Sequence, residues 1–328
     1  MFSYAVRRVL ATIPLLIIAT MGLFWMVASV RDPVAELRVS CPKCDQTAYD
    51  RLIDLYDLDK PVFDVTNPAN SRYFAWLGNA LTGDFGTSTS QGENPVSDFV
   101  WTRAKNTMIL AVPAFFVIAT IATLIGVYSA VRQYSISDYV LTGFSFVGIA
   151  LPTFVFGLFL QVFWGVWFRN WTGWKPFFTS QMHDDSLLEL VQSATLPIAT
   201  LTLVIVATES RFIRASMLEV VHSDYIRTAR AKGLPEWRVI LRHALRNALI
   251  PVVTLWALDF AALLGGSVIT ESIFSWPGLG PMLLSAIFAA DVHLVMAIVL
   301  FVSVLAIGFN LIADLLYGVL DPRVRVAG

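Results

Sequence analysis

The sequence has few charged residues, and this shortage narrows what the chain can be. Asp, Glu, Lys and Arg together make up 14% of the 328 residues, whereas 56% are hydrophobic. The mean hydropathy of +0.67 lies outside the usual range of a soluble globular chain. A formal net charge of −1 also argues against a general basic field for binding nucleic acid. Lipid is therefore the expected solvent.

Motifs for nucleotide, zinc and acyl-transfer chemistry are missing as well. The sequence contains no G-x-x-x-x-G-K-[ST] segment that would cradle nucleotide phosphates. It also contains no H-E-x-x-H zinc motif and no G-x-S-x-G nucleophile motif. We therefore expect no catalytic residue, no metal site and no cofactor in this chain, so any ATP hydrolysis must lie in a partner.

Cysteine occurs only twice, which excludes a disulfide framework or a four-cysteine metal site within the chain. The pair Cys41 and Cys44 can be a redox pair, half of a metal site, free thiols or a small disulfide. A redox pair would need a βαβ context, which the sequence lacks. The expected location outside the membrane is oxidising and favours a disulfide between the two.

Long apolar runs are what the sequence has instead. A spanning helix needs roughly 20 mostly apolar residues to cross about 30 Å of hydrocarbon. The first run is too long for a signal-peptide core and predicts a retained signal anchor. The fourth run is short, but Arg211 and Arg214 can snorkel and let its helix continue. The pattern predicts an all-α, polytopic membrane protein with six transmembrane helices, at Val9–Val30, Thr107–Val131, Tyr139–Phe168, Ala194–Val206, Ala248–Ile269 and Val292–Leu316.

The placement of Lys and Arg predicts the orientation, because short loops rich in these residues stay in the cytoplasm. In a six-span chain one side carries Arg7, Arg8, Arg132, the cluster from Arg211 to Arg246, Arg323 and Arg325. The stretch from Glu271 to Asp291, on the other side, has no Lys or Arg. Both termini are thus expected in the cytoplasm. The predicted domains are residues 1–30, an extracytoplasmic insert at 31–105, and a five-helix core at 106–328 with a cytoplasmic loop at 211–247.

The loop between the fourth and fifth spans has the pattern of helix, turn, helix. Ser223 or Asp224 can cap the first helix, and Gly233 can take the left-handed conformation that closes it. Pro235 suits the first turn of the next helix. A basic stripe is then predicted from arginines at every fourth residue, Arg238, Arg242 and Arg246. By itself this pattern fits either an interfacial helix that meets anionic lipid or a cytoplasmic helix that docks a partner.

The segment Asp224 to Gly233, followed by Leu245 to Pro251, resembles the EAA loop of permease subunits of binding-protein-dependent ABC importers, particularly the oligopeptide and dipeptide branch. Other segments resemble that branch in the family order. They are Trp76 to Asn79, Gly83 to Ser88, Glu271 to Gly280, Asp314 to Tyr317 and Leu320 to Arg323. The resemblance covers nearly the whole chain and leaves mainly Arg38 to Val65 unmatched.

This resemblance implies a type I ABC importer permease fold, in which the first helix of the loop is a coupling helix that enters a cleft on an ATPase subunit. Two positions depart from the broad family motif. Arg227 stands where the motif has glutamate, and Arg246 where it has proline, so the resemblance does not carry over a salt bridge from that glutamate to the ATPase. The implied coupling residues are Asp224, Tyr225, Arg227, Thr228, Ala229, Arg230, Ala231, Lys232 and Gly233.

The resemblance also implies a larger complex in a bacterial inner membrane. A second homologous permease would complete the pathway, and two ABC ATPase subunits, or one fused ATPase, would bind ATP and magnesium. An extracytoplasmic binding protein would deliver the substrate. Peptides are the cargo that the branch suggests, although related permeases carry nickel, opines, sugars or glutathione.

Asp259 lies inside the otherwise apolar fifth span, where an ionised carboxylate is costly and normally faces protein or water. We expect it to line the pathway or to hydrogen-bond between helices. A proton relay is disfavoured, because no second buried acid or base accompanies Asp259 in that span. Small residues four positions apart, Ala261 with Gly265 and Ala262 with Gly266, permit close helix packing within the subunit or at the seam with a second permease.

Two other classes of membrane protein are rivals to this interpretation. An ion-coupled secondary transporter would show intramembrane charged pairs or broken helices in matching halves, and the sequence has one intramembrane acid and no convincing inverted repeat. A membrane-embedded hydrolase would need a nucleophile with a base near it.

Overall fold

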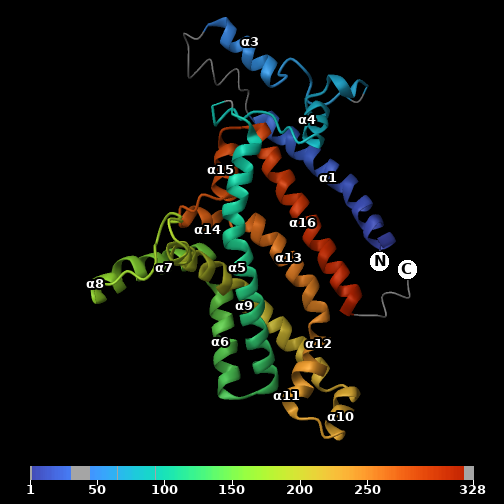
Figure 1. Cartoon of the computed structure of the whole chain (residues 1–328), viewed down its shortest axis with the longest axis vertical. Coiled ribbons are helices and arrows are strands. Elements are labelled where there is room, and N and C mark those ends of the chain that lie inside the picture. Colours follow the sequence, from blue (N-terminus) through green and yellow to red (C-terminus); the bar gives the residue numbers. More distant parts are fainter. Residues whose placement is uncertain (1, 31–44, 65, 93, 321–328) are drawn as a thin grey trace. The chain divides into compact units, whose positions relative to one another are not determined.

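The computed structural model describes residues 2–30, 45–64, 66–92 and 94–320 (Figure 1). Cys41 and Cys44 lie outside these residues, so their disulfide stays a prediction. The fold is all-helical, and the pairing of Thr87 with Pro95 is an isolated bridge. The chain forms two compact units: one comprises residues 1–8, 106–280 and 305–328, and the other comprises residues 9–105 and 281–304.

The described residues form α-helices of very different lengths, with short 3₁₀ and π segments between some of them. The 3₁₀ turn is Pro68–Asn70, and the π-helices are η2 (Phe163–Phe168) and η3 (Val239–Ala244). The α-helices are α1 (Phe2–Val30), α3 (Gln46–Leu55), α4 (Arg72–Leu81), α5 (Val96–Val131), α6 (Ile136–Ala150), α7 (Thr153–Val162), α8 (Arg169–Thr172), α9 (Leu187–Val221), α10 (Asp224–Ala231), α11 (Glu236–Arg238), α12 (Leu245–Ala248), α13 (Ile250–Gly266), α14 (Val268–Ile273), α15 (Leu279–Phe288) and α16 (Val292–Leu320).

Five stretches are long and apolar enough to cross a membrane, and a sixth is counted if α6 and the helix after it form one broken span. The third span was predicted as one helix over Tyr139–Phe168, and this is wrong. The two halves meet at a bend of 101°. Pro152 explains the break, because proline has no N–H to donate and pushes the preceding residue out of the helical region. Leu151 is accordingly extended, with φ −85° and ψ 121°.

The fourth span extends far beyond the predicted run Ala194–Val206. Helix α9 contains 35 residues and continues through Arg211 and Arg214, as expected. It begins after Ser186, whose hydroxyl accepts a hydrogen bond from the backbone N–H of Glu189 at 3.2 Å. Because α6, α7, α12, α13 and α14 all pack against it, α9 is the central helix of its unit.

The other unit has a small aromatic core that ties the insert to α1. Phe24 on α1 contacts Tyr73 and Trp76 on α4, and Met296 of α16 completes the buried cluster. The hydroxyls of Tyr73 and Thr20 share a hydrogen bond of 2.8 Å. The insert is therefore packed onto membrane-spanning helices of its own unit.

Asp291 holds the segment after Gly86 in the same unit. Its buried carboxylate accepts hydrogen bonds from the hydroxyls of Ser88 and Ser90, at 2.5 and 2.8 Å, and from the Ser90 N–H at 3.0 Å. Its other oxygen accepts from the N–H of Leu294 in the first turn of α16, at 3.1 Å. One side chain thus joins a helix start to a loop about 200 residues earlier in the chain.

We predict that Asp291→Ala loosens this loop, because the Ser88 and Ser90 donors lose a buried acceptor. The expected cost is about 2 kcal/mol, or roughly 30-fold more frequent local opening. Limited proteolysis between Gly86 and Asn94 measures this opening. Asp98→Ala, which removes an exposed carboxylate, is the control. Equal cleavage rates in the two variants would contradict the anchoring role.

Candidate functional site

Helix α10 is the first half of the loop that the sequence singled out. Ser223 occupies its N-cap position, and its carbonyl accepts from the N–H groups of Ile226 and Arg227 at 3.1 and 3.2 Å. We expected the Ser223 hydroxyl to be able to cap the helix, but it makes no capping hydrogen bond. It donates instead to the carbonyl of Val220, three residues earlier, at 2.6 Å. This bond ties the start of α10 to the last turn of α9.

Gly233 closes α10 in the left-handed conformation that the sequence predicted, with φ +76°. Its N–H donates to the carbonyl of Arg230 at 2.9 Å. A Cβ atom at Gly233 would meet no atom within 4 Å. Backbone conformation, and not crowding, therefore favours glycine here.

Two side-chain contacts hold the halves of the loop together. The guanidinium of Arg230 pairs with the Glu236 carboxylate across the turn, with a shortest distance of 2.7 Å. Hydrogen bonding within this pair raises the pKa of Arg230 and lowers that of Glu236. Farther along, the amide of Asn247 donates to the Tyr225 hydroxyl at 3.0 Å. These two non-covalent contacts hold the segment from α10 to α12 together.

Most of the implied coupling residues lie on the exposed face of α10 and its turn. Ile226 and Ala229 are buried, so Ala229 packs inward and does not form part of a docking surface. Arg227 and Asp224 are 3.9 Å apart with largely exposed side chains, so their pair contributes little. The exposed members are Asp224, Tyr225, Arg227, Thr228, Arg230, Ala231, Lys232 and Gly233.

The second half of the loop differs from the predicted regular helix. The π-helix η3 lies between Arg238 and Arg246 and widens the turn, so the three arginines do not keep the spacing of an α-helical stripe. All three are nevertheless exposed, while Val239, Ala244 and Ala248 are buried. Arg238 stacks over the ring of Trp237, 5.3 Å from its centroid. The loop therefore does present exposed arginines as predicted, but the π-helix changes their spacing.

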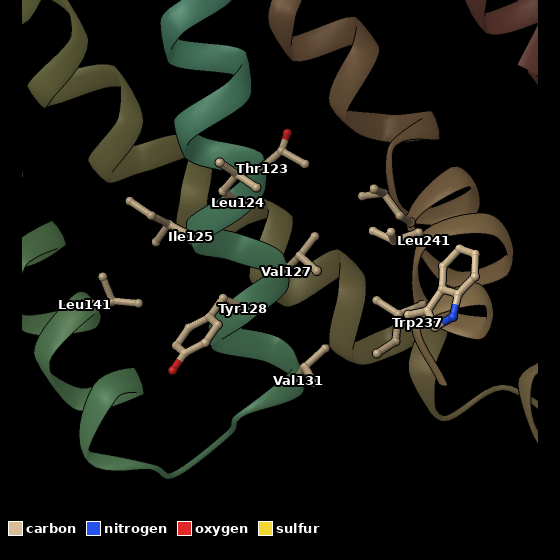
Figure 2. Close-up of a pocket in the computed structure, with 11 residues that line it drawn as sticks. Thr123, Leu124, Ile125, Val127, Tyr128, Val131, Leu141, Trp237 and Leu241 are labelled. Atoms are coloured by element: carbon tan, nitrogen blue, oxygen red, sulfur yellow. The ribbon is translucent and has the colours of Figure 1, made fainter. Parts of the chain in front are cut away.

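An apolar cleft of about 570 Å³ lies between α5 and this second half (Figure 2). Leu124, Tyr128 and Val131 line it on α5, and Trp237 and Leu241 line it on the loop. Because the lining is almost wholly apolar, the cleft suits hydrophobic groups and not charged solutes.

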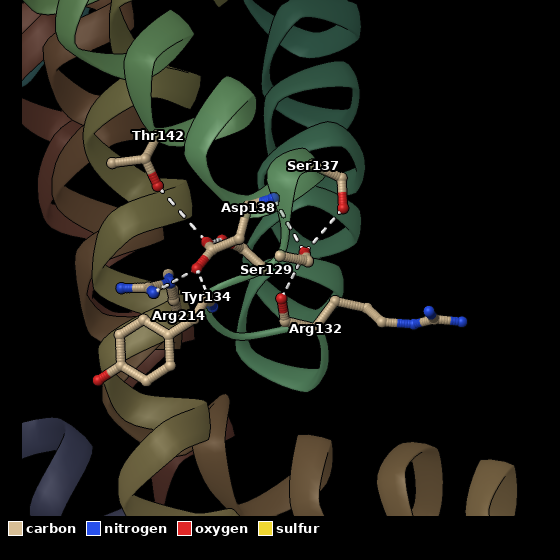
Figure 3. Close-up of polar contacts among 8 residues, drawn as sticks. Ser129, Arg132, Tyr134, Ser137, Asp138, Thr142 and Arg214 are labelled. Carbon is tan, nitrogen blue, oxygen red and sulfur yellow. Dashed lines mark hydrogen bonds and ion pairs between the residues drawn. The ribbon is translucent and has the colours of Figure 1, made fainter.

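Asp138 anchors α9 just before the loop (Figure 3). Its carboxylate is buried and accepts from the Arg214 guanidinium of α9 at 2.8 Å, from the Tyr134 N–H at 3.0 Å, and from the Ser129 hydroxyl of α5. The ends of α5, α6 and α9 therefore meet at one carboxylate. The sequence analysis missed this residue. The local signal for it was Ser135, whose hydroxyl caps α6 by accepting from the Asp138 N–H.

Glu271 organises the segment that follows α14. It is fully buried and accepts from the hydroxyls of Thr107 and Ser267, at 2.8 and 2.9 Å, and from the Gly280 N–H at 2.8 Å. A Cβ on Gly278 would collide with its carboxylate, and one on Gly280 would lie 2.5 Å from the Cα of Val268. This explains why the segment Glu271 to Gly280 carries glycine at both positions.

Asp259 lies on α13 and is partly exposed. One turn earlier on the same helix, the indole N–H of Trp256 donates to the buried carboxyl of Glu209, on α9, at 3.2 Å. This hydrogen bond is a polar contact between α13 and α9, and the role of Asp259 in the pathway stays a prediction. A Cβ at Gly265 would meet no atom within 4 Å, so close packing at that position within the described chain is not seen. Gly266 ends α13, and a role at a subunit seam stays a prediction for both glycines.

We predict that Gly278→Ala destabilises the chain by about 1–3 kcal/mol, because the new methyl group displaces the Glu271 carboxylate from its three donors. Heating the detergent-solubilised protein and measuring the fraction that stays soluble gives the effect. Gly78→Ala is the matched control, since a Cβ there meets no atom within 4 Å. Identical melting of the two variants would show that the hydrogen bonds of Glu271 do not stabilise this segment.

Comparison with known proteins agrees with this architecture. Residues 122–326 match the family described as the inner membrane component of binding-protein-dependent transport systems. The chain is 38% identical to the oligopeptide transport system permease protein AppB of Bacillus subtilis, over 99% of this chain and 100% of that protein. It is 34% identical to the glutathione transport system permease protein GsiC of Shigella flexneri, over 99% of both chains. A chain of the inward-facing MetNI methionine ABC transporter shares its fold, with a TM-score of 0.54, 14% identity, and coverage of 68% of this chain and 96% of that one.

Proposed function

The chain belongs to the family of inner membrane components of binding-protein-dependent transport systems, and from this premise we propose that it forms half of a peptide pathway in an ATP-driven importer. The names of the relatives AppB and GsiC support a peptide cargo. A second, homologous permease forms the other half. ATP and magnesium bind to ATPase subunits and not to this chain, and an extracytoplasmic binding protein delivers the peptide.

The observation that carries the proposal is the construction of α10. Its exposed face is polar, and its start is bonded to α9. It is joined to α11 by Arg230 with Glu236, and to α12 by Tyr225 with Asn247. A helix mounted in this way moves together with the rest of the loop. We propose that it docks in the ATPase cleft and passes the closure of the ATPase dimer to the membrane spans.

The route for that motion follows from the packing of α9. The loop begins where α9 ends, at Val221, and leads into α13 at Ile250. Arg214 on α9 is bonded to Asp138 at the α5–α6 junction, so a displacement of α9 also pulls on α5 and α6. Peptide passage would then follow from alternation between inward-open and outward-open arrangements of the paired permeases.

The proposal places both termini and α10 in the cytoplasm and the insert outside. In a background in which Cys41 and Cys44 are serine, a cysteine at His222 should react with an impermeant maleimide only after the membrane is opened. A cysteine at Gln91 should react in intact cells. The reason is the excess of Lys and Arg in the short loops on the His222 side. Labelling of both positions from the same side of the membrane would contradict this topology.

A second prediction concerns coupling itself. Gly233→Val imposes a β-branched side chain on a left-handed residue at a cost of about 1–2 kcal/mol, which is small against the insertion of the spans. Membrane abundance should stay near normal while peptide uptake and substrate-stimulated ATP hydrolysis are lost. Gly233→Asn is the control, because asparagine tolerates this conformation.

Full uptake by well-expressed Gly233→Val would show that this turn does not transmit motion. The energy source distinguishes the proposed ATP-driven importer from the rival, an ion-coupled secondary transporter. In proteoliposomes with all partners and no ion gradient, the proposal requires peptide uptake with ATP alone. Uptake that needs an ion gradient and ignores ATP would favour the rival.

A further inference from the structure

A cavity of about 310 Å³ lies within the unit that contains the insert, and we call it the insert cavity. Its lining comes from α1, the turn after α3, one face of α4, the loop between α4 and α5, and the start of α16. The volume is at the lower end of the range of small-molecule sites, roughly 300–1,000 Å³. Unlike the cleft beside α5, the insert cavity has both polar and apolar lining, which suits a small polar molecule.

Contacts within the unit hold the walls of the insert cavity in place. The rings of Phe24 and Trp76 pack with their centroids 6.2 Å apart, and both side chains are buried. The ring of His293 packs against Tyr56 at 5.1 Å, and its Nδ1–H donates to the carbonyl of Thr87 at 3.1 Å. The cavity is therefore built into the packed part of this unit.

Helix α4 contributes three side chains with N–H donors to the lining. Arg72, Trp76 and Asn79 are spaced by four and three residues, so they share one face of the helix. Trp76 is 4% exposed, and its indole N–H is buried and donates to no acceptor among the described residues. Because a buried donor without an acceptor is costly, this N–H favours a ligand that brings an acceptor into the cavity.

Asp84, in the loop after α4, contributes a negative charge to the same lining. One of its oxygens accepts from the N–H of Gly86 at 2.9 Å, and its carboxylate forms no ion pair with a described residue. The other carboxylate of the lining, that of Asp57, pairs with Lys60 at 2.7 Å. The insert cavity thus combines a donor that lacks an acceptor with a carboxylate that lacks a cation.

A molecule that carries an ammonium and a carboxylate supplies both missing partners. We propose that the insert cavity binds a short zwitterionic peptide. The peptide carboxylate accepts from the Trp76 N–H, on the α4 face that also carries Arg72, and the peptide ammonium pairs with Asp84. The rings of Phe24 and Trp76 offer apolar contact to a side chain. The choice of a peptide among zwitterions rests on the proposed function, and the small volume excludes a long one.

Equilibrium dialysis of the lipid-reconstituted transport complex, prepared without its binding protein, tests the ligand chemistry with radiolabelled dialanine as the probe. Dialanine should bind saturably. N-acetyl-dialanine lacks the ammonium and dialanine amide lacks the carboxylate, so each should compete roughly tenfold more weakly or worse. Glycerophosphoethanolamine, a zwitterionic lipid headgroup, should also compete more weakly than dialanine. No saturable binding, equal competition by the blocked peptides, or tighter binding of the headgroup overturns the proposal.

Single substitutions test whether the binding occurs in the insert cavity. Trp76→Phe keeps an aromatic ring and removes the N–H, so dialanine should bind roughly tenfold more weakly. Asp84→Asn should weaken dialanine binding similarly and leave the weak binding of N-acetyl-dialanine unchanged, because that peptide has no ammonium. Trp101→Phe and Asp98→Asn change exposed residues of α5 outside the lining and are the matched controls. Wild-type dialanine binding by Trp76→Phe or Asp84→Asn, or an equal loss in the controls, overturns the site.

ATP-dependent peptide uptake by the same complex, with its binding protein added, separates this inference from the proposed function. Uptake by a complex that shows no saturable dialanine binding would overturn the insert cavity as a peptide site and leave the proposed function in place. Dialanine binding with the expected pattern of variants, but without ATP-dependent uptake, would count against the proposed function. The zwitterion site would still stand in that case.

Discussion

A carboxyl group that is removed from water needs hydrogen-bond donors or a proton within a few ångströms, and this need decides how the helices of this protein meet. Asp138 finds its donors on α5, on the turn before α6, and on α9. Glu271 finds them on α5, at the end of α13, and at Gly280. Apolar helices surrounded by lipid gain little from hydrophobic burial against each other, so such polar contacts fix which faces pack.

The loop from α10 to α12 depends on polar contacts because it has little core of its own. Ile226 and Ala229 are the buried residues of α10, and most of its surface is exposed. Its orientation therefore comes from its connections: the Ser223 bond to the end of α9, the Arg230 to Glu236 pair, and the contact of Tyr225 with Asn247. An exposed ion pair is weak by itself. Here it acts together with the backbone turn at Gly233, and both restrict how the two short helices are arranged.

Local sequence patterns were enough to predict the spans, the continuation of α9 through Arg211 and Arg214, and the left-handed Gly233. Each of these depends on neighbours within a few residues. The bend at Pro152 was also a local signal, but the long apolar run around it hid the break. The hydrogen bond between Trp256 and Glu209 could not be found in this way, because the two residues are 47 apart in the chain and their contact depends on how α9 packs against α13. The same holds for Arg214 and Asp138, which are 76 residues apart.

Two joints on α9 show how position along a span selects the chemistry. Arg214 and Glu209 are five residues apart, which is roughly 7.5 Å along the helix. Near the loop, a long arginine keeps part of its side chain exposed while its guanidinium pairs with Asp138. One and a half turns farther from the loop, an arginine would have to bring a charge into a more apolar setting, and α9 carries the buried carboxyl of Glu209 there. Its contact with α13 is a hydrogen bond from the indole N–H of Trp256 at 3.2 Å, and this donor brings no charge with it. An ion pair close to the loop and a neutral donor farther along the helix thus hold α9 to different neighbours, α6 in one case and α13 in the other.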